Sequence, residues 1–160
     1  MTLRSILFAA FVALAASPAA AQPAADLPYG APIQLAPAEQ IVDAAQAFAE
    51  QNGLAVAIAV VDSGGRLVSF RRMDTVGTAV IDIAIGKAYT AASMRQPSAN
   101  LEGWASNSSA PTAIPGIMPF GGGVPIEIDG RIVGGIGVSG EATADDLRVV
   151  AAGLAALNAR

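Results

Sequence analysis

The chain has 160 residues, 53% of them hydrophobic, and a formal net charge of −4 at pH 7. A nucleic-acid or anionic-membrane surface requires clustered Lys and Arg, so the acidic balance argues against both. The chain contains no Cys and no His. This excludes disulfides, a Ser-His-Asp triad and a cysteine nucleophile, and it argues against a zinc site.

The first 21 residues have the pattern of a secretory signal peptide. Arg4 gives the basic start, residues 6–16 form the apolar segment, and small residues at 19–21 precede Gln22. The apolar run is too short to span a bilayer, and a lipoprotein anchor would require a cysteine. We therefore expect an exported protein, periplasmic or secreted, without a membrane anchor.

The remaining chain predicts one domain behind a short arm. Residues 22–37 are rich in Pro and Ala and predict an extended N-terminal arm. Residues 38–160 then form the single domain. Its first segment, residues 38–52, has apolar residues at helical spacing and is followed by Gly53, which predicts a helix that ends there.

A hairpin and two helices follow. Residues 54–62 alternate large and small apolar side chains, which predicts a strand buried on both faces, with a small-residue face that a helix can approach. The turn at 63–65 leads into a second strand over 66–74. Residues 78–94 predict the central helix, and residues 97–107 a short one.

The last part of the sheet is predicted from short apolar runs. Residues 117–120 and 124–128 are expected to be short strands, and residues 131–139 the returning strand. Asp129-Gly130 between the last two is typical of a tight hairpin turn.

A final helix over 144–158 closes the domain. Thr143, with Asp146 three residues later, resembles a capping box in which Asp replaces Glu. Hairpins dominate the predicted order of elements. We therefore expect an α+β fold, a mostly antiparallel sheet with helices packed on it.

Four stretches carry a resemblance to a known family: residues 59–74, 84–92, 120–140 and 145–157. They are similar in sequence and order to the GlcG/HbpS family, and also to the C-terminal domain of PduO-type proteins. The resemblance implies a profilin-like or roadblock-like fold with about five antiparallel strands. It also implies homo-oligomers, from dimers up to octamers.

The resemblance implies function less firmly than fold. Some members of the family bind haem, and an exported member acts as a haem or redox sensor with a partner kinase. Others are associated with glycolate or diol metabolism without an agreed reaction.

Two groups of glycines need an explanation. Gly121 to Gly123 follow Phe120, and their N–H groups could form an anion-binding nest. The alternative is a bulged turn that requires positive φ. For Gly134, Gly135 and Gly137, inside the returning strand, close packing of a helix explains the pattern better than chemistry.

The charged candidates are Lys87 and the end of the second strand. Lys87 is the only lysine. It could pair with a haem propionate or a small organic acid, or it could cap a sheet carbonyl or pair with an acid of a neighbouring subunit. Alternation puts Arg71 and Met73 on one face and Arg72 and Asp74 on the other. This end is either an anion-binding edge or a solvated strand end with local ion pairs.

Haem ligation would be unusual in this chain. Without His or Cys, the axial ligand must come from a Met, Tyr or Lys side chain. The candidates are Met73, Met94, Met118, Tyr29, Tyr89 and Lys87. Each could equally be a packing residue. Haem would then be weakly ligated, or held through the porphyrin face and its propionates. The carboxylates of Asp62, Asp74 and Asp82 share no predicted face and carry little weight as acid–base pairs.

The first hypothesis is an exported oligomer that binds haem or a related small anionic ligand, in sensing or haem handling, and is not an enzyme. Its pocket is expected between the central helix and the glycine loop. The predicted ligand contacts are Lys87, Arg72, Met73, Met118, Phe120 and Gly121 to Gly123. The alternative is an enzyme or accessory factor for a small oxygenated acid, with Lys87 as base or nucleophile. A third hypothesis is a purely structural or interaction module.

Overall fold

The computed structural model describes the backbone of residues 27–158 and the side chains of residues 27–157. The predicted signal peptide and the first residues of the arm lie outside this range. In chain order the elements are α1 (Leu35–Gln51), β1 (Ala57–Asp62), β2 (Leu67–Arg72), α2 (Thr78–Met94), α3 (Glu102–Asn107), β3 (Gly123–Ile128), β4 (Arg131–Ser139) and α4 (Thr143–Ala155). Short 3-10 helices occupy Ser98–Leu101, Pro111–Ala113 and Ala156–Asn158. None of the helices in the described range is long and apolar enough to cross a membrane.

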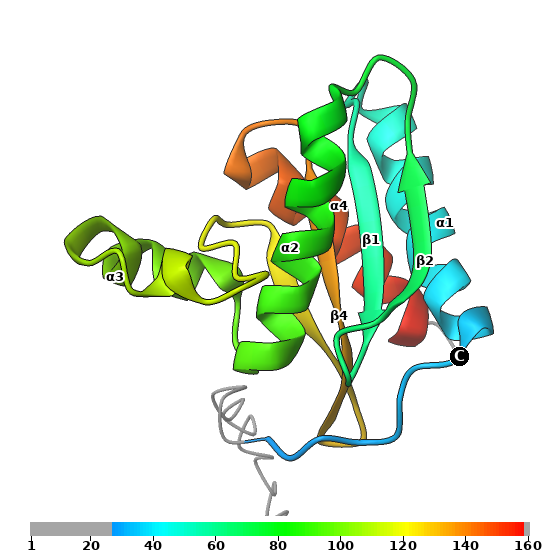
Figure 1. The fold of residues 1–160 in the computed structure, drawn as a ribbon. Helices are drawn as coiled ribbons and strands as arrows, with labels where there is room; N and C mark the ends of the chain where they lie inside the picture. Colours follow the sequence, from blue (N-terminus) through cyan, green and yellow to red (C-terminus); the bar gives the residue numbers. More distant parts are fainter. Residues whose placement is uncertain (1–26, 159–160) are drawn as a thin grey trace, which may run out of the picture.

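The sheet is the middle layer of three. Its strands are antiparallel in the order β2-β1-β4-β3. Helix α2 covers one face, and α1 with α4 covers the other (Figure 1). The alternation predicted for β1 is confirmed: Ile58 and Val60 pack with α1 and α4, while Ala57 and Ala59 pack with α2. The small side chains let α2 lie close to the sheet.

Glycines in β4 bring α2 closer still. A Cβ placed on Gly135 would meet the carbonyl oxygen of Ala88, and one on Gly137 would meet backbone atoms of Ala84 and Ala88. Real Cβ atoms cannot approach backbone so closely, so the strand needs glycine where the helix crosses it. The predicted close packing of a helix is confirmed for Gly135 and Gly137, whereas a Cβ on Gly134 would meet the Val61 carbonyl oxygen of β1 and Ile33 of the arm.

The arm packs against the start of β4. The Gly30 N–H donates to the Ile132 carbonyl at 2.8 Å, and the Ile33 N–H donates to the Val133 carbonyl at 2.9 Å. The Tyr29 hydroxyl reaches the Ala92 carbonyl at the end of α2, at 3.1 Å. Helix α1 begins at Leu35, three residues before the predicted start. The arm therefore contributes hydrogen bonds to the domain.

One predicted strand is wrong. Residues 117–120 form no strand, and within the described range the sheet has four strands where about five were expected. The Met118 N–H is bonded to the Thr90 hydroxyl of α2, and the Phe120 N–H to the Met118 carbonyl. Pro119 has no N–H to donate. The backbone donors of this segment are thus used away from any strand ladder.

The predicted hairpin turn, central helix and short helix are confirmed. Asp129 and Gly130 have φ of 51° and 68°, the two positive values that a tight turn of this class requires. Helix α2 spans Thr78–Met94, as predicted, and Arg95 at φ 52° ends it. The short helix after Pro97 is a 3-10 turn followed by α3.

Candidate functional site

Lys87 is buried among partners of its own chain. Its side chain lies in α2 and is 4% exposed. Nζ donates to Asp146 Oδ2 at 2.9 Å, to the Val138 carbonyl at 3.0 Å and to Ser139 Oγ at 3.3 Å. An ammonium group has three N–H donors, so all are used. Lys87 therefore caps a sheet carbonyl and pairs with an acid, and it joins α2, β4 and α4.

Asp146, the acidic partner of Lys87, was predicted to cap the last helix, and this prediction is wrong. The residue before α4 is Ala142, and no side chain caps this helix. Asp146 turns inward instead: one oxygen accepts from Lys87, and the other accepts from the Glu141 N–H at 3.2 Å. Burial raises the pKa of the Asp146 carboxyl above its ordinary value of 3.8, although the hydrogen bond and charge of Lys87 partly oppose this.

This raised pKa gives the protein a characteristic pH dependence. The unfolded chain loses the Asp146 proton near its ordinary pKa, while the folded protein keeps it to higher pH. The contribution of Asp146 to the free energy of unfolding is therefore full below the ordinary pKa and falls as pH rises through the folded pKa. We expect the difference in unfolding free energy, wild type minus Asp146→Asn, to decrease in urea denaturation as pH rises from below 3.8 through the folded pKa. A difference that grows over that range would contradict the direction of the shift.

The glycine loop packs on this cluster. The Gly121 N–H donates to Glu102 Oε1 at 2.6 Å, and the Gly123 N–H to Ser98 Oγ at 2.9 Å. Gly122 has φ of 111°, and a Cβ on it would lie 2.6 Å from the Val138 carbonyl oxygen. Two of the three N–H groups are thus used within the protein, and the backbone of Gly122 requires glycine. These contacts match the bulged-turn explanation, and they leave little of an anion-binding nest.

The second strand ends at a separate hollow. Arg72 and Met73, with Asp74, line a cavity of about 390 Å³ that Gln46 and Glu50 complete. Arg71 turns toward α1, where it pairs with Asp43 at 3.0 Å. The structure therefore does not bring Arg72 and Lys87 together, because one lies at the exposed end of β2 and the other is buried beneath the glycine loop.

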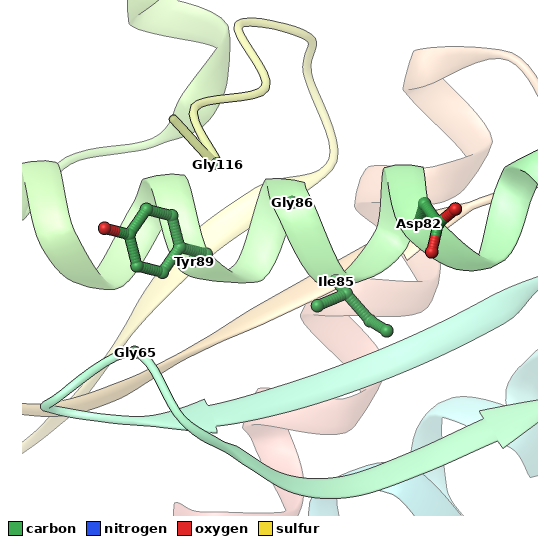
Figure 2. Close-up of a pocket in the computed structure, with 6 residues that line it drawn as sticks. All are labelled: Gly65, Asp82, Ile85, Gly86, Tyr89 and Gly116. Atoms are coloured by element: carbon green, nitrogen blue, oxygen red, sulfur yellow. The ribbon is translucent and has the colours of Figure 1, made fainter. Parts of the chain in front are cut away.

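A different pocket lies on the outer face of α2. Its volume is about 240 Å³, and its lining residues are Gly65, Asp82, Ile85, Gly86, Tyr89 and Gly116. Asp82 and Tyr89 stand at opposite ends with Ile85 between them, while the turn at Gly65 and the loop at Gly116 lie on either side of the helix (Figure 2). We call this the α2 pocket.

The ring of Tyr89 is held between two glycines. A Cβ on Gly65 would lie 2.6 Å from the ring's Cδ2 atom, and one on Gly116 would lie 3.0 Å from its Cε1 atom. Opposite edges of the ring therefore face the two glycines, and any side chain there would displace it. Within the described residues the Tyr89 hydroxyl makes no hydrogen bond, whereas the Tyr29 hydroxyl reaches the Ala92 and Ser93 carbonyls.

The other candidate ligands are divided among three places. Met118 is half-buried beside the α2 pocket, because a Cβ on Gly86 would lie 3.0 Å from its own Cβ. Met73 packs in the layer under α1. Phe120 is 54% exposed and lines a third hollow with Glu102 and Pro119. The structure thus groups Tyr89 with Met118 and separates both from Met73 and Phe120.

Sequence reasoning named Tyr89 but missed most of the pocket around it. Gly65, Gly116, Ile85 and Gly86 were not candidates. The spacing of Asp82, Ile85, Gly86 and Tyr89 places all four on one face of α2. This spacing indicates a shared surface on the helix. The two glycines, however, come from distant segments, and no local sequence pattern links them to that surface.

Comparison with known proteins shows the family to which this chain belongs. Residues 33–155 match the family described as haem degrading protein, HbpS-like. The GlcG protein of Escherichia coli is 38% identical over 103 residues, which cover 64% of this chain and 77% of GlcG.

Two solved structures share the fold. A double mutant of HbpS from Streptomyces reticuli superposes with a TM-score of 0.74 at 35% identity, covering 89% of this chain and 98% of that one. A complex of PduOC with haem superposes with a TM-score of 0.73 at 26% identity, covering 79% of this chain and 96% of that one. The chain therefore belongs to the HbpS-like family of haem degrading proteins, as its sequence motifs indicated.

Proposed function

We propose that this protein binds haem, or a closely related flat ligand with anionic groups, at the α2 pocket. Membership of the HbpS-like family and the structural likeness to a haem complex of PduOC support the proposal. The observation that carries it is the ring of Tyr89, which Gly65 and Gly116 hold on both edges and whose hydroxyl, free within the described residues, points away from Ile85 (Figure 2).

The residues of the α2 pocket fit what haem requires. Ile85 and Gly86 offer apolar surface to a porphyrin face, and the phenol oxygen of Tyr89 can ligate iron. Arg66 follows Gly65, is exposed, and makes no side-chain hydrogen bond or ion pair within residues 27–158, so it can neutralise a propionate. The hollow is smaller than most small-molecule sites, so it encloses only part of a macrocycle.

Bound haem would supply the redox-active iron, while this chain's residues hold and orient it. The alternative, an enzyme that uses Lys87 as base or nucleophile, is less well supported. A nucleophilic lysine must be neutral and reachable, whereas this one is 4% exposed and paired with Asp146.

The proposal also covers where the protein is located, how it assembles and whether it takes part in signalling. The pattern of residues 1–21 supports an exported protein that is periplasmic or secreted. The sequence resemblance supports a homo-oligomer and a role in haem sensing or handling, with a sensor kinase as partner.

Two exposed charges test the sign of the ligand's charge: Asp82, which lines the α2 pocket, and Arg66, which follows the lining residue Gly65. In a hemin titration followed by absorption, the wild type should give a saturable Soret shift. Asp82→Asn should tighten binding because it removes a negative charge near the propionates, and Arg66→Gln should weaken it. Each change should be at most about fivefold, because both groups are exposed.

Asp82→Asn keeps the size of the side chain, and Arg66→Gln shortens it but keeps it polar, so each serves as the other's control for the change of charge. Both effects should shrink at high salt, which screens exposed charges. Weaker binding by Asp82→Asn together with tighter binding by Arg66→Gln would indicate a cationic ligand. A rise in absorption that does not saturate would contradict haem binding.

A further inference from the structure

We infer that Tyr89 is the iron ligand of bound haem, and that the site therefore retains ferric rather than ferrous haem. The inference rests on the proposed function and gives it a defined chemistry. It starts from the lining of the α2 pocket, in which two side chains carry an oxygen atom, Tyr89 and Asp82.

The other candidate ligands are engaged elsewhere in the described structure. Lys87 has no free donor and is buried. The Tyr29 hydroxyl is bonded to two carbonyls at the end of α2. Met73 packs under α1, on the opposite side of the sheet from the α2 pocket. Met94, the last residue of α2, does not line the α2 pocket. Tyr89 and Met118 therefore remain as the residues to compare.

The geometry favours Tyr89 over Met118. The Tyr89 ring is positioned on both edges by Gly65 and Gly116, so its hydroxyl is presented without loss of side-chain freedom on binding. The terminal methyl of Met118 lies 3.4 Å from a Cβ placed on Gly86, so this side chain rests on the helix surface. Met118 also does not line the α2 pocket.

The chemistry of a phenol ligand sets the oxidation state. The Tyr89 oxygen donates an electron pair to ferric iron, its proton passes to water, and no electron is transferred. The resulting phenolate is an anionic oxygen ligand, which matches the harder, more highly charged ferric ion better than the ferrous one. Reduction of the bound haem should therefore weaken this bond.

The test is Tyr89→Phe, which keeps the ring between Gly65 and Gly116 and removes only the oxygen. Hemin binding would be followed by absorption and by electron paramagnetic resonance. The wild type should show a high-spin ferric spectrum with a phenolate-to-iron charge-transfer band. Tyr89→Phe should lose the band and bind hemin about tenfold or more weakly. Tyr29→Phe and Met118→Leu, the matched controls, should keep the band.

Dithionite reduction adds a second readout, because the wild-type spectrum should revert toward that of free haem. Resonance Raman detection of iron-bound tyrosinate in the wild type keeps the test decisive even if Tyr89→Phe fails to fold. Saturable binding with the same spectrum in Tyr89→Phe would overturn the inference but leave the proposed function standing. If Tyr89→Phe kept hemin binding and Met118→Leu lost it, the inference would be overturned in favour of Met118. Absence of saturable hemin binding by the wild type would overturn both.

Discussion

Asp146→Ala should lower the free energy of unfolding by about 3–5 kcal/mol, because it leaves the buried Nζ of Lys87 and the Glu141 N–H without their carboxyl acceptor. The Lys87–Asp146 pair is 2.9 Å long, and both side chains are almost fully buried. The pair also fixes the positions of α2, α4 and the end of β4 relative to one another. Urea denaturation followed by circular dichroism measures the loss.

Two controls separate this effect from a general sensitivity of α4. Asp145→Ala removes the neighbouring carboxylate, whose pair with Arg148 is largely exposed, and should cost less than about 1 kcal/mol. The double variant Lys87→Met with Asp146→Leu should recover most of the lost stability, since an apolar pair can replace a buried ion pair. If Asp146→Ala cost no more than Asp145→Ala, the pair would not be structural.

Gly137→Ala should be the second large loss of stability, because the new methyl would meet the backbone of α2 at Ala84 and Ala88. The helix must move away from the sheet, and overpacking of this kind costs about 1–3 kcal/mol. Thermal unfolding measures the change. Gly103→Ala in α3 is the matched control, because nothing lies within 4 Å of its added Cβ.

In α3 alanine is a better helix former than glycine, so Gly103→Ala should leave stability unchanged or raise it by up to about 1 kcal/mol. Equal melting of Gly137→Ala and the wild type would show that α2 can shift without cost. The position of α2 matters for function, since this helix carries four of the residues that line the α2 pocket.

Much of the fold could be predicted because it depends on local patterns. The central helix, the turn at Asp129-Gly130 and the small-residue face of β1 each follow from residues close together in the sequence. The family could be recognised for the same reason. The segment 117–120 failed because its apolar residues resemble a strand, whereas its backbone donors are satisfied by Thr90 and a local turn.

The candidate site was less predictable because it depends on long-range contacts. Lys87 attracted attention as the only lysine, but its partner Asp146 is 59 residues away and read as a helix cap. The predicted pocket beneath the glycine loop is filled by this pair. The α2 pocket combines Tyr89 with glycines from two separate loops, and no pattern in the sequence brings these residues together.

The most direct test of the account is to locate hemin by nuclear magnetic resonance on the 15N-labelled protein. Ferric iron broadens nearby amide signals, and gallium protoporphyrin provides the diamagnetic control. We predict broadening centred on Gly65, the α2 segment from Asp82 to Tyr89, and Gly116, with the same amides shifted by the gallium complex. Broadening centred instead on Arg72 and Met73, or spread evenly over the protein, would contradict a haem site on the outer face of α2.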